Sequence, residues 1–87
     1  MTAQNCVEIE SIARDVMTAH QNDLPMSKVM GIVQNSLADV PVLAMVGRQL
    51  TIDAYSTPSY MGAEMQQKAI DDFANDRADD CYSVVSN

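Results

Sequence analysis

Few side chains in this 87-residue protein could act as a nucleophile or bind a metal. Cys6 lies near the start, Cys81 near the end, and His20 is the only histidine. A nucleophilic thiol needs a base or a positive charge beside it to form the thiolate. If the first segment is one helix, His20 lies about 21 Å from Cys6 by helical rise. Asp79 and Asp80 would raise the pKa of the Cys81 thiol, so we expect no thiol catalysis.

The same separation argues against a zinc site. Zinc takes four ligands, and two cysteines with one remote histidine cannot supply them. His20 instead suits the last turn of a helix, where it interacts favourably with the helix dipole. The sequence has no glycine-rich phosphate loop, nucleotide motif or Ser-His-Asp set. We therefore expect neither enzyme activity nor a cofactor.

Acidic side chains concentrate in the run DDFANDRADD. Asp72, Asp76 and Asp80 would form an i,i+4 row on a helix, with about 6 Å between neighbours. Calcium loops wrap their ion with a turn and a central glycine, and this run has neither. Neighbouring aspartates on a helix point about 100° apart, which does not suit an acid–base pair. The row is therefore expected to be a solvated helix face or an interaction surface that mimics nucleic-acid charge.

The overall charge favours a protein partner. The chain carries 12 acidic and 5 basic residues, for a formal net charge of −7. Binding to nucleic acid or to anionic membranes depends on lysine and arginine, so this balance argues against both. A basic protein surface is the better electrostatic partner. No apolar run approaches the roughly 20 residues of a transmembrane helix, so we expect no membrane insertion.

Proline, glycine and asparagine divide the chain into four segments with the apolar spacing of helices. Cys6 lies on the apolar face of the first segment and Cys81 on that of the fourth, whose stripe only Arg77 interrupts. The predicted helices cover about residues 4–21, 27–35, 39–56 and 62–84.

The two middle helices are predicted less directly. Ser27 and Asp39 are candidate N-caps, and Pro41 is tolerated in a first turn. Gly31 either weakens the second helix or permits close packing there. Residues 49–55 also alternate like a strand, but a lone strand would have no partner to pair its edges, so we favour a helix.

These segments predict one all-α domain over residues 1–87, a small bundle or array of about four helices. In up-down-up-down order, the start of the first helix meets the end of the fourth, which places Cys6 beside Cys81. A disulfide between them would staple a small domain, whereas the alternative is two buried thiols. Because disulfides persist in oxidising compartments, the pairing favours the periplasm or the outside of the cell.

A second candidate surface lies between the third and fourth segments. Tyr55, Pro58 and Tyr60 in DAYSTPSYMG could form an exposed aromatic patch, or else a packed corner between two helices. Tyr55, Tyr60 and the adjacent Met61 are therefore candidates for an interaction surface. The seven methionines of the chain mainly suit a core that is short of aromatics, although Met also forms adaptable binding surfaces. Spare Met and Tyr surface could also pair two copies as a homodimer.

The order of these features resembles a group of small exported helical proteins of unknown function in bacteriophage and proteobacterial genomes. The resemblance rests on ARDVMTAHQNDLPMSKVM, IDAYSTPSY and MQQKAIDDF, and on a cysteine near each end. It implies an exported, disulfide-bonded helical domain, and it transfers no catalytic residues. A signal peptide usually precedes the first cysteine in that group, whereas the start MTAQNCVEIE has no signal-peptide features.

Two functional hypotheses follow from the sequence. The leading one is a small non-catalytic protein-binding module, a phage-encoded modulator of a host or phage protein in the periplasm. The alternative is a cytoplasmic acidic inhibitor that occupies a basic nucleic-acid-binding surface by charge mimicry.

Overall fold

The computed structural model describes residues 2–85, and this part of the chain forms four α-helices. No residue in this range belongs to a strand, so the predicted all-α class and the helical interpretation of residues 49–55 are confirmed. The helices are α1 (Ala3–Gln21), α2 (Met26–Ser36), α3 (Pro41–Tyr55) and α4 (Ala63–Val84).

The helix starts differ from those expected. Neither Ser27 nor Asp39 is an N-cap, since the N-caps of α2 and α3 are Pro25 and Val40, and neither makes a side-chain capping bond. Each start lies at a proline, whose restricted φ favours the first turn of a helix without a polar cap. Pro41 takes the first position of α3, as predicted.

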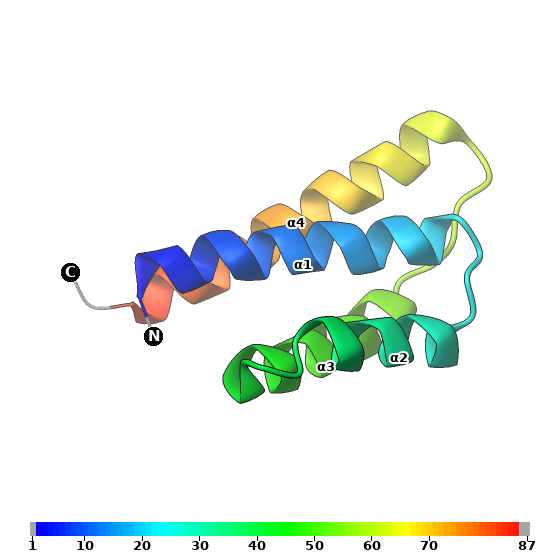
Figure 1. The fold of residues 1–87 in the computed structure, drawn as a ribbon. Coiled ribbons are helices and arrows are strands. Elements are labelled where there is room, and N and C mark those ends of the chain that lie inside the picture. The colour runs from blue at the N-terminus through cyan, green and yellow to red at the C-terminus, as the bar shows by residue number, and fades with distance from the viewer. Residues whose placement is uncertain (1, 86–87) are drawn as a thin grey trace.

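α1 is the central helix of the fold, as Figure 1 shows. α4 packs along it in the opposite direction, and the α2–α3 hairpin lies on its other side, with α2 packed mainly on α3. Successive helices alternate in direction, so the two ends of the described chain come together. The fold is flat, with extents of 39 × 25 × 16 Å, because α3 and α4 both pack on α1 but make little contact with each other.

The core follows the apolar stripe of α1. Ile9, Ala13, Val16 and Met17 are buried and face residues from the three other helices. Burial of this stripe is the main favourable term in folding, since each fully buried aliphatic side chain contributes roughly 1.5–3 kcal/mol. The other helices contribute the buried residues Val29, Val33, Leu43, Leu50, Ala54, Ile70, Ala74 and Cys81.

The disulfide between Cys6 and Cys81 joins the first turns of α1 to the last turns of α4, which confirms the predicted pairing. Their Cα atoms lie 5.5 Å apart, although the residues are separated by 75 positions in the sequence. Further along the same two helices, Arg14 Nη1 donates a 2.6 Å hydrogen bond to Asp71 Oδ1. The disulfide and this hydrogen bond therefore connect α1 and α4 at two positions along their length, in addition to the apolar contacts.

The two glycines within helices have opposite environments. A Cβ atom on Gly47 of α3 would lie 2.7 Å from Val33 Cγ1 and 3.0 Å from Leu37 Cδ1. Gly47 therefore permits the close approach of α2 and α3. A Cβ atom on Gly31 would meet nothing within 4 Å, so Gly31 does not serve close packing.

Candidate functional site

Two surface depressions lie along α4, and each is lined by one residue of α1. The loop-end depression, of about 220 Å³, lies between α4 and the connection that follows α3. The disulfide-end depression, of about 290 Å³, lies between α3 and the last turns of α4. We refer to both depressions together as the α3–α4 groove.

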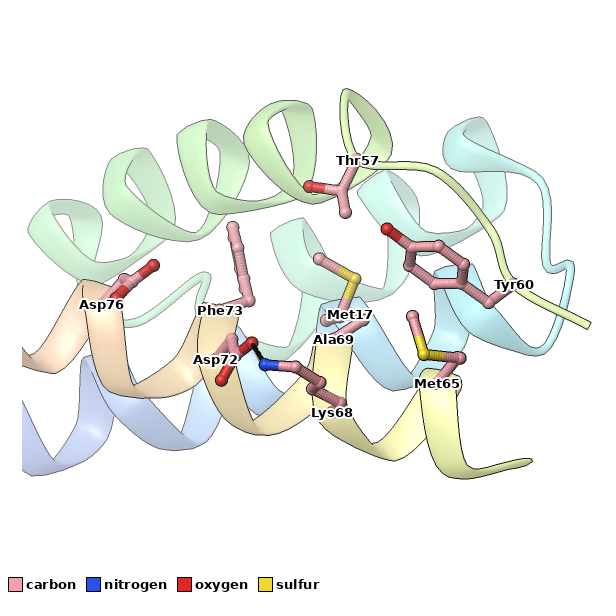
Figure 2. Close-up of a pocket in the computed structure, with 9 residues that line it drawn as sticks. All are labelled: Met17, Thr57, Tyr60, Met65, Lys68, Ala69, Asp72, Phe73 and Asp76. Carbon is pink, nitrogen blue, oxygen red and sulfur yellow. Dashed lines mark hydrogen bonds and ion pairs between the residues drawn. The ribbon is translucent and has the colours of Figure 1, made fainter. Parts of the chain in front are cut away.

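The loop-end depression has an apolar floor and a charged rim. The Met17 side chain of α1 lies between Phe73 of α4 and Tyr60 of the connection (Figure 2). Met65, with 48% of its surface exposed, forms part of the wall. The rim carries the polar side chains of Thr57, Lys68, Asp72 and Asp76.

The disulfide-end depression is lined mainly by aliphatic side chains. Ile9 of α1 and Leu50 of α3 form its apolar surface together with Val46 and Cys81. Three of these four are buried in the core, whereas Val46 is partly exposed. Its polar rim consists of Gln49, Asp53, Arg77 and Asp80.

Arg77, the polar residue that interrupts the apolar stripe of α4, lies on the rim of the disulfide-end depression. Its Nη1 lies 3.5 Å from Asp53 of α3, and its Nη2 lies 3.3 Å from Asp80. The guanidinium also lies over the Phe73 ring, 5.5 Å from the ring centroid, within the range of a cation–π contact. Arg77 therefore connects α3 and α4 across the groove while its stem covers apolar surface.

The rim of the groove is acidic. Four carboxylates, those of Asp53, Asp72, Asp76 and Asp80, line it with only two cations, Lys68 and Arg77. Lys68 Nζ donates a 2.7 Å hydrogen bond to Asp72, and this bond raises the pKa of the lysine. The excess of carboxylates leaves the groove with a negative potential.

The predicted row of aspartates lies along this rim. Asp72 and Asp76 border the loop-end depression and Asp80 borders the other one. Asp72 is paired with Lys68 and Asp80 with Arg77. Among residues 2–85, no lysine, arginine or histidine forms an ion pair with Asp76.

The predicted tyrosine and methionine surface is divided among different environments. Tyr55 is partly buried, its hydroxyl donates a hydrogen bond to the Leu24 carbonyl, and its ring centroid lies 4.3 Å from that of His20. Burial raises the pKa of Tyr55. Tyr60 lines the loop-end depression, whereas Met61 is fully exposed and lines neither depression.

Gln21 positions the wall of the groove, and sequence reasoning missed it. This buried side chain donates from Nε2 to the Pro58 carbonyl at 2.9 Å and accepts at Oε1 from the Tyr60 N–H at 2.8 Å. From α4, Gln66 Nε2 donates to the Tyr60 carbonyl at 2.7 Å. The sequence feature that could have identified Gln21 is its position four residues after Met17, on the buried stripe of α1.

His20 lies at the same end of α1, as expected for a residue in its last turn, and its Nε2 forms a 2.6 Å bond to the Thr57 carbonyl. The disulfide lies at the opposite end of α1, so the fold does not bring His20 to either cysteine.

Residues 2–85 contain no cluster of three or more His, Cys, Asp or Glu side chains that could hold a metal ion. None of the helices in this range combines the length and apolar character needed to cross a membrane. Comparison with protein-family models, with curated proteins and with solved structures found no match to this chain.

Proposed function

We propose that this protein is a small non-catalytic module that binds another protein in the α3–α4 groove. The observation that carries the proposal is the groove itself, in which apolar side chains from three helices lie beneath an acidic rim. A bound partner would cover the partly exposed apolar side chains of the lining, which are Val46, Tyr60, Met65 and Phe73. Covering them removes apolar surface from water, and the charged rim adds specificity and steers association.

A wider role goes with this proposal. The module acts outside the reducing cytoplasm, in the periplasm or after secretion, as a phage-encoded modulator of a host or phage protein. The Cys6–Cys81 disulfide supports this placement, because such bonds persist in oxidising compartments. The resemblance to small exported phage and proteobacterial proteins supports it as well.

The alternative proposal, a cytoplasmic inhibitor that mimics nucleic-acid charge, depends on the bare charge of the aspartate row. Lys68 and Arg77 already pair with two of its three members, Asp72 and Asp80, which reduces that charge. Charge mimicry predicts that neutralising the row abolishes binding, whatever happens to the apolar floor. Groove binding predicts that a change in the floor alone is sufficient.

Site-specific photo-cross-linking tests the groove proposal. Benzoylphenylalanine is placed at Gln49, an exposed residue of the groove, or at Gln34, an exposed residue of α2 outside it. The oxidised protein is then added to an extract of the cells that encode it. We expect a cross-linked protein from position 49 and none from position 34.

Competition by unlabelled variants shows which surface of the protein the partner binds. Unlabelled wild type and Met45→Lys should suppress the cross-link, whereas Met65→Lys should not, because it puts a charge into the loop-end depression. Met45 is a matched control because it is exposed on α3 and lines neither groove depression. Equal cross-linking from both positions, or equal competition by Met65→Lys, would overturn groove binding.

A further inference from the structure

We infer that the ligand of the α3–α4 groove is a basic amphipathic helix that places two apolar side chains, about two turns apart, in the two depressions. This inference rests on the proposed protein-binding function and specifies its partner. It follows from the shape of the groove, the spacing of its depressions and the charge of its rim.

The walls of the groove favour a helix over an extended strand. A strand binds by pairing with free backbone N–H and C=O groups at a sheet edge. α3 and α4 are helices whose backbone groups already bond within each helix, apart from the terminal turns. A helix needs only side-chain contacts. One laid along α4 would pack against α4 and the connection in the loop-end depression, and against α3 and α4 in the disulfide-end one.

The spacing of the depressions sets the spacing of the ligand's apolar residues. The α4 residues that line the loop-end depression run from Met65 to Asp76, and those that line the disulfide-end one run from Arg77 to Cys81. The rise along α4 between the midpoints of these two ranges is about 13 Å. Side chains at i and i+7 or i+8 of a ligand helix lie roughly 10–12 Å apart on the same face. The ligand helix therefore inserts one apolar side chain in each depression, and Arg77 and Asp53 form part of the rim of the disulfide-end one.

The charge of the rim selects a basic ligand. Asp76 lies on the rim without an ion-pairing cation among residues 2–85. A lysine or arginine beside the apolar stripe of the ligand would supply that cation. The formal net charge of −7 also attracts a basic ligand over longer distances and disfavours an acidic one.

Selection from a random library of peptides of about five helical turns tests this inference directly. Peptides are selected on the immobilised, oxidised wild type, with counter-selection on Gln49→Lys/Met65→Lys, which adds a charge in each depression. We expect the enriched peptides to carry net positive charge and apolar residues at i and i+7 or i+8. Their circular dichroism should show helix formation on binding.

A charge reversal provides the matched control. Asp76→Lys should weaken binding of the enriched peptides roughly tenfold, because it replaces an attraction at the rim by a repulsion. Asp79→Lys makes the same change of charge on α4 outside both depressions, so its effect should stay within about twofold.

The outcomes separate the two proposals. Groove-dependent peptides that are acidic, or that lack the helical period, would overturn the basic-helix inference and leave protein binding in the groove intact. Equal effects of Asp76→Lys and Asp79→Lys would likewise overturn the role of the rim. If no peptide distinguishes the wild type from the counter-selection variant, both this inference and the proposed function fail.

Discussion

Single polar side chains hold the wall of the groove, and Gln21 is the clearest case. Its amide is almost fully buried and is bonded to both sides of the Pro58–Tyr60 segment. A buried polar group without partners is costly, so this side chain belongs at its position only because the connection supplies a donor and an acceptor. The loop-end depression therefore depends on a residue from α1 as well as on those that line it.

Replacing Gln21 should loosen this wall. Gln21→Ala leaves the Pro58 carbonyl and the Tyr60 N–H without their side-chain partner, and we expect a loss of about 1–3 kcal/mol in the free energy of unfolding. Urea denaturation measures it. Gln34→Ala, at an exposed position on α2, should change that free energy by less than about 0.5 kcal/mol. Equal losses in the two variants would contradict the role of Gln21.

The Arg14–Asp71 pair gives the fold a pH dependence. Hydrogen bonds from Arg14 and Gln67 lower the pKa of Asp71 in the folded protein. A carboxylate with a lowered folded pKa contributes stability above its unfolded pKa, and that contribution is lost as the pH falls through the folded value. Asp71 therefore stabilises the protein at neutral pH. This contribution begins to fall near the unfolded pKa of about 4 and is lost once the pH drops below the lower folded pKa.

Replacing Arg14 should reduce the dependence of stability on pH. We expect the fall in Tm between neutral pH and about pH 3 to be smaller in Arg14→Gln than in the wild type. Lys28→Gln removes the same charge from an exposed site on α2 that makes no ion pair among residues 2–85, and it should retain the wild-type fall. Identical pH profiles for both variants would contradict the assignment.

At the scale of helices, sequence periodicity predicted each element but not how closely the elements approach. Gly31 and Gly47 are both helix-interior glycines, so propensity alone treats them alike. The close contact at Gly47 arises from the side chains of Val33 on α2 and of Leu37, the C-cap of α2. The starts of α2 and α3 were also mispredicted, because proline geometry replaced the polar caps expected at Ser27 and Asp39.

The two glycines should respond to alanine in opposite directions. Gly31→Ala has open space for its methyl group, and should gain roughly 0.5–1 kcal/mol in unfolding free energy through better helix propensity. Gly47→Ala would force α2 away from α3 and should lose about 1–3 kcal/mol. Each variant is the control for the other in one urea denaturation series. The same sign for both changes would contradict the packing described at Gly47.

At the scale of the whole molecule, the disulfide closes nearly the entire chain around a flat, open array. A chain of this size has a small core, so a constraint on the unfolded state contributes much of its stability. The flatness that limits the core also leaves the α3–α4 groove accessible. The flat arrangement of the four helices therefore accounts both for the importance of the disulfide and for the exposure of the groove.

Loss of the disulfide should be the most damaging of the changes considered. For a sequence separation of 75, the chain-entropy model gives about 4 kcal/mol of stabilisation. Cys6→Ala/Cys81→Ala should lower the free energy of unfolding by about that amount in urea denaturation. Dithiothreitol should destabilise the wild type to a similar degree and leave the double variant unchanged. A loss below about 1 kcal/mol would show that the staple is dispensable.

The sequence by itself determined the four helices and the all-α class, and it placed Cys6 beside Cys81, whereas the structure decided between a disulfide and two buried thiols. The helices and the proximity of the two cysteines follow from apolar spacing and from the alternating direction of helices joined by short connections, both of which are local properties. Only the tertiary structure decided that α3 and α4 stay apart, that Arg77 spans the gap to Asp53, and that Gln21 holds the connection. The physical reason is that crossing geometry and buried polar partners depend on residues far apart in the chain, which no periodic pattern encodes.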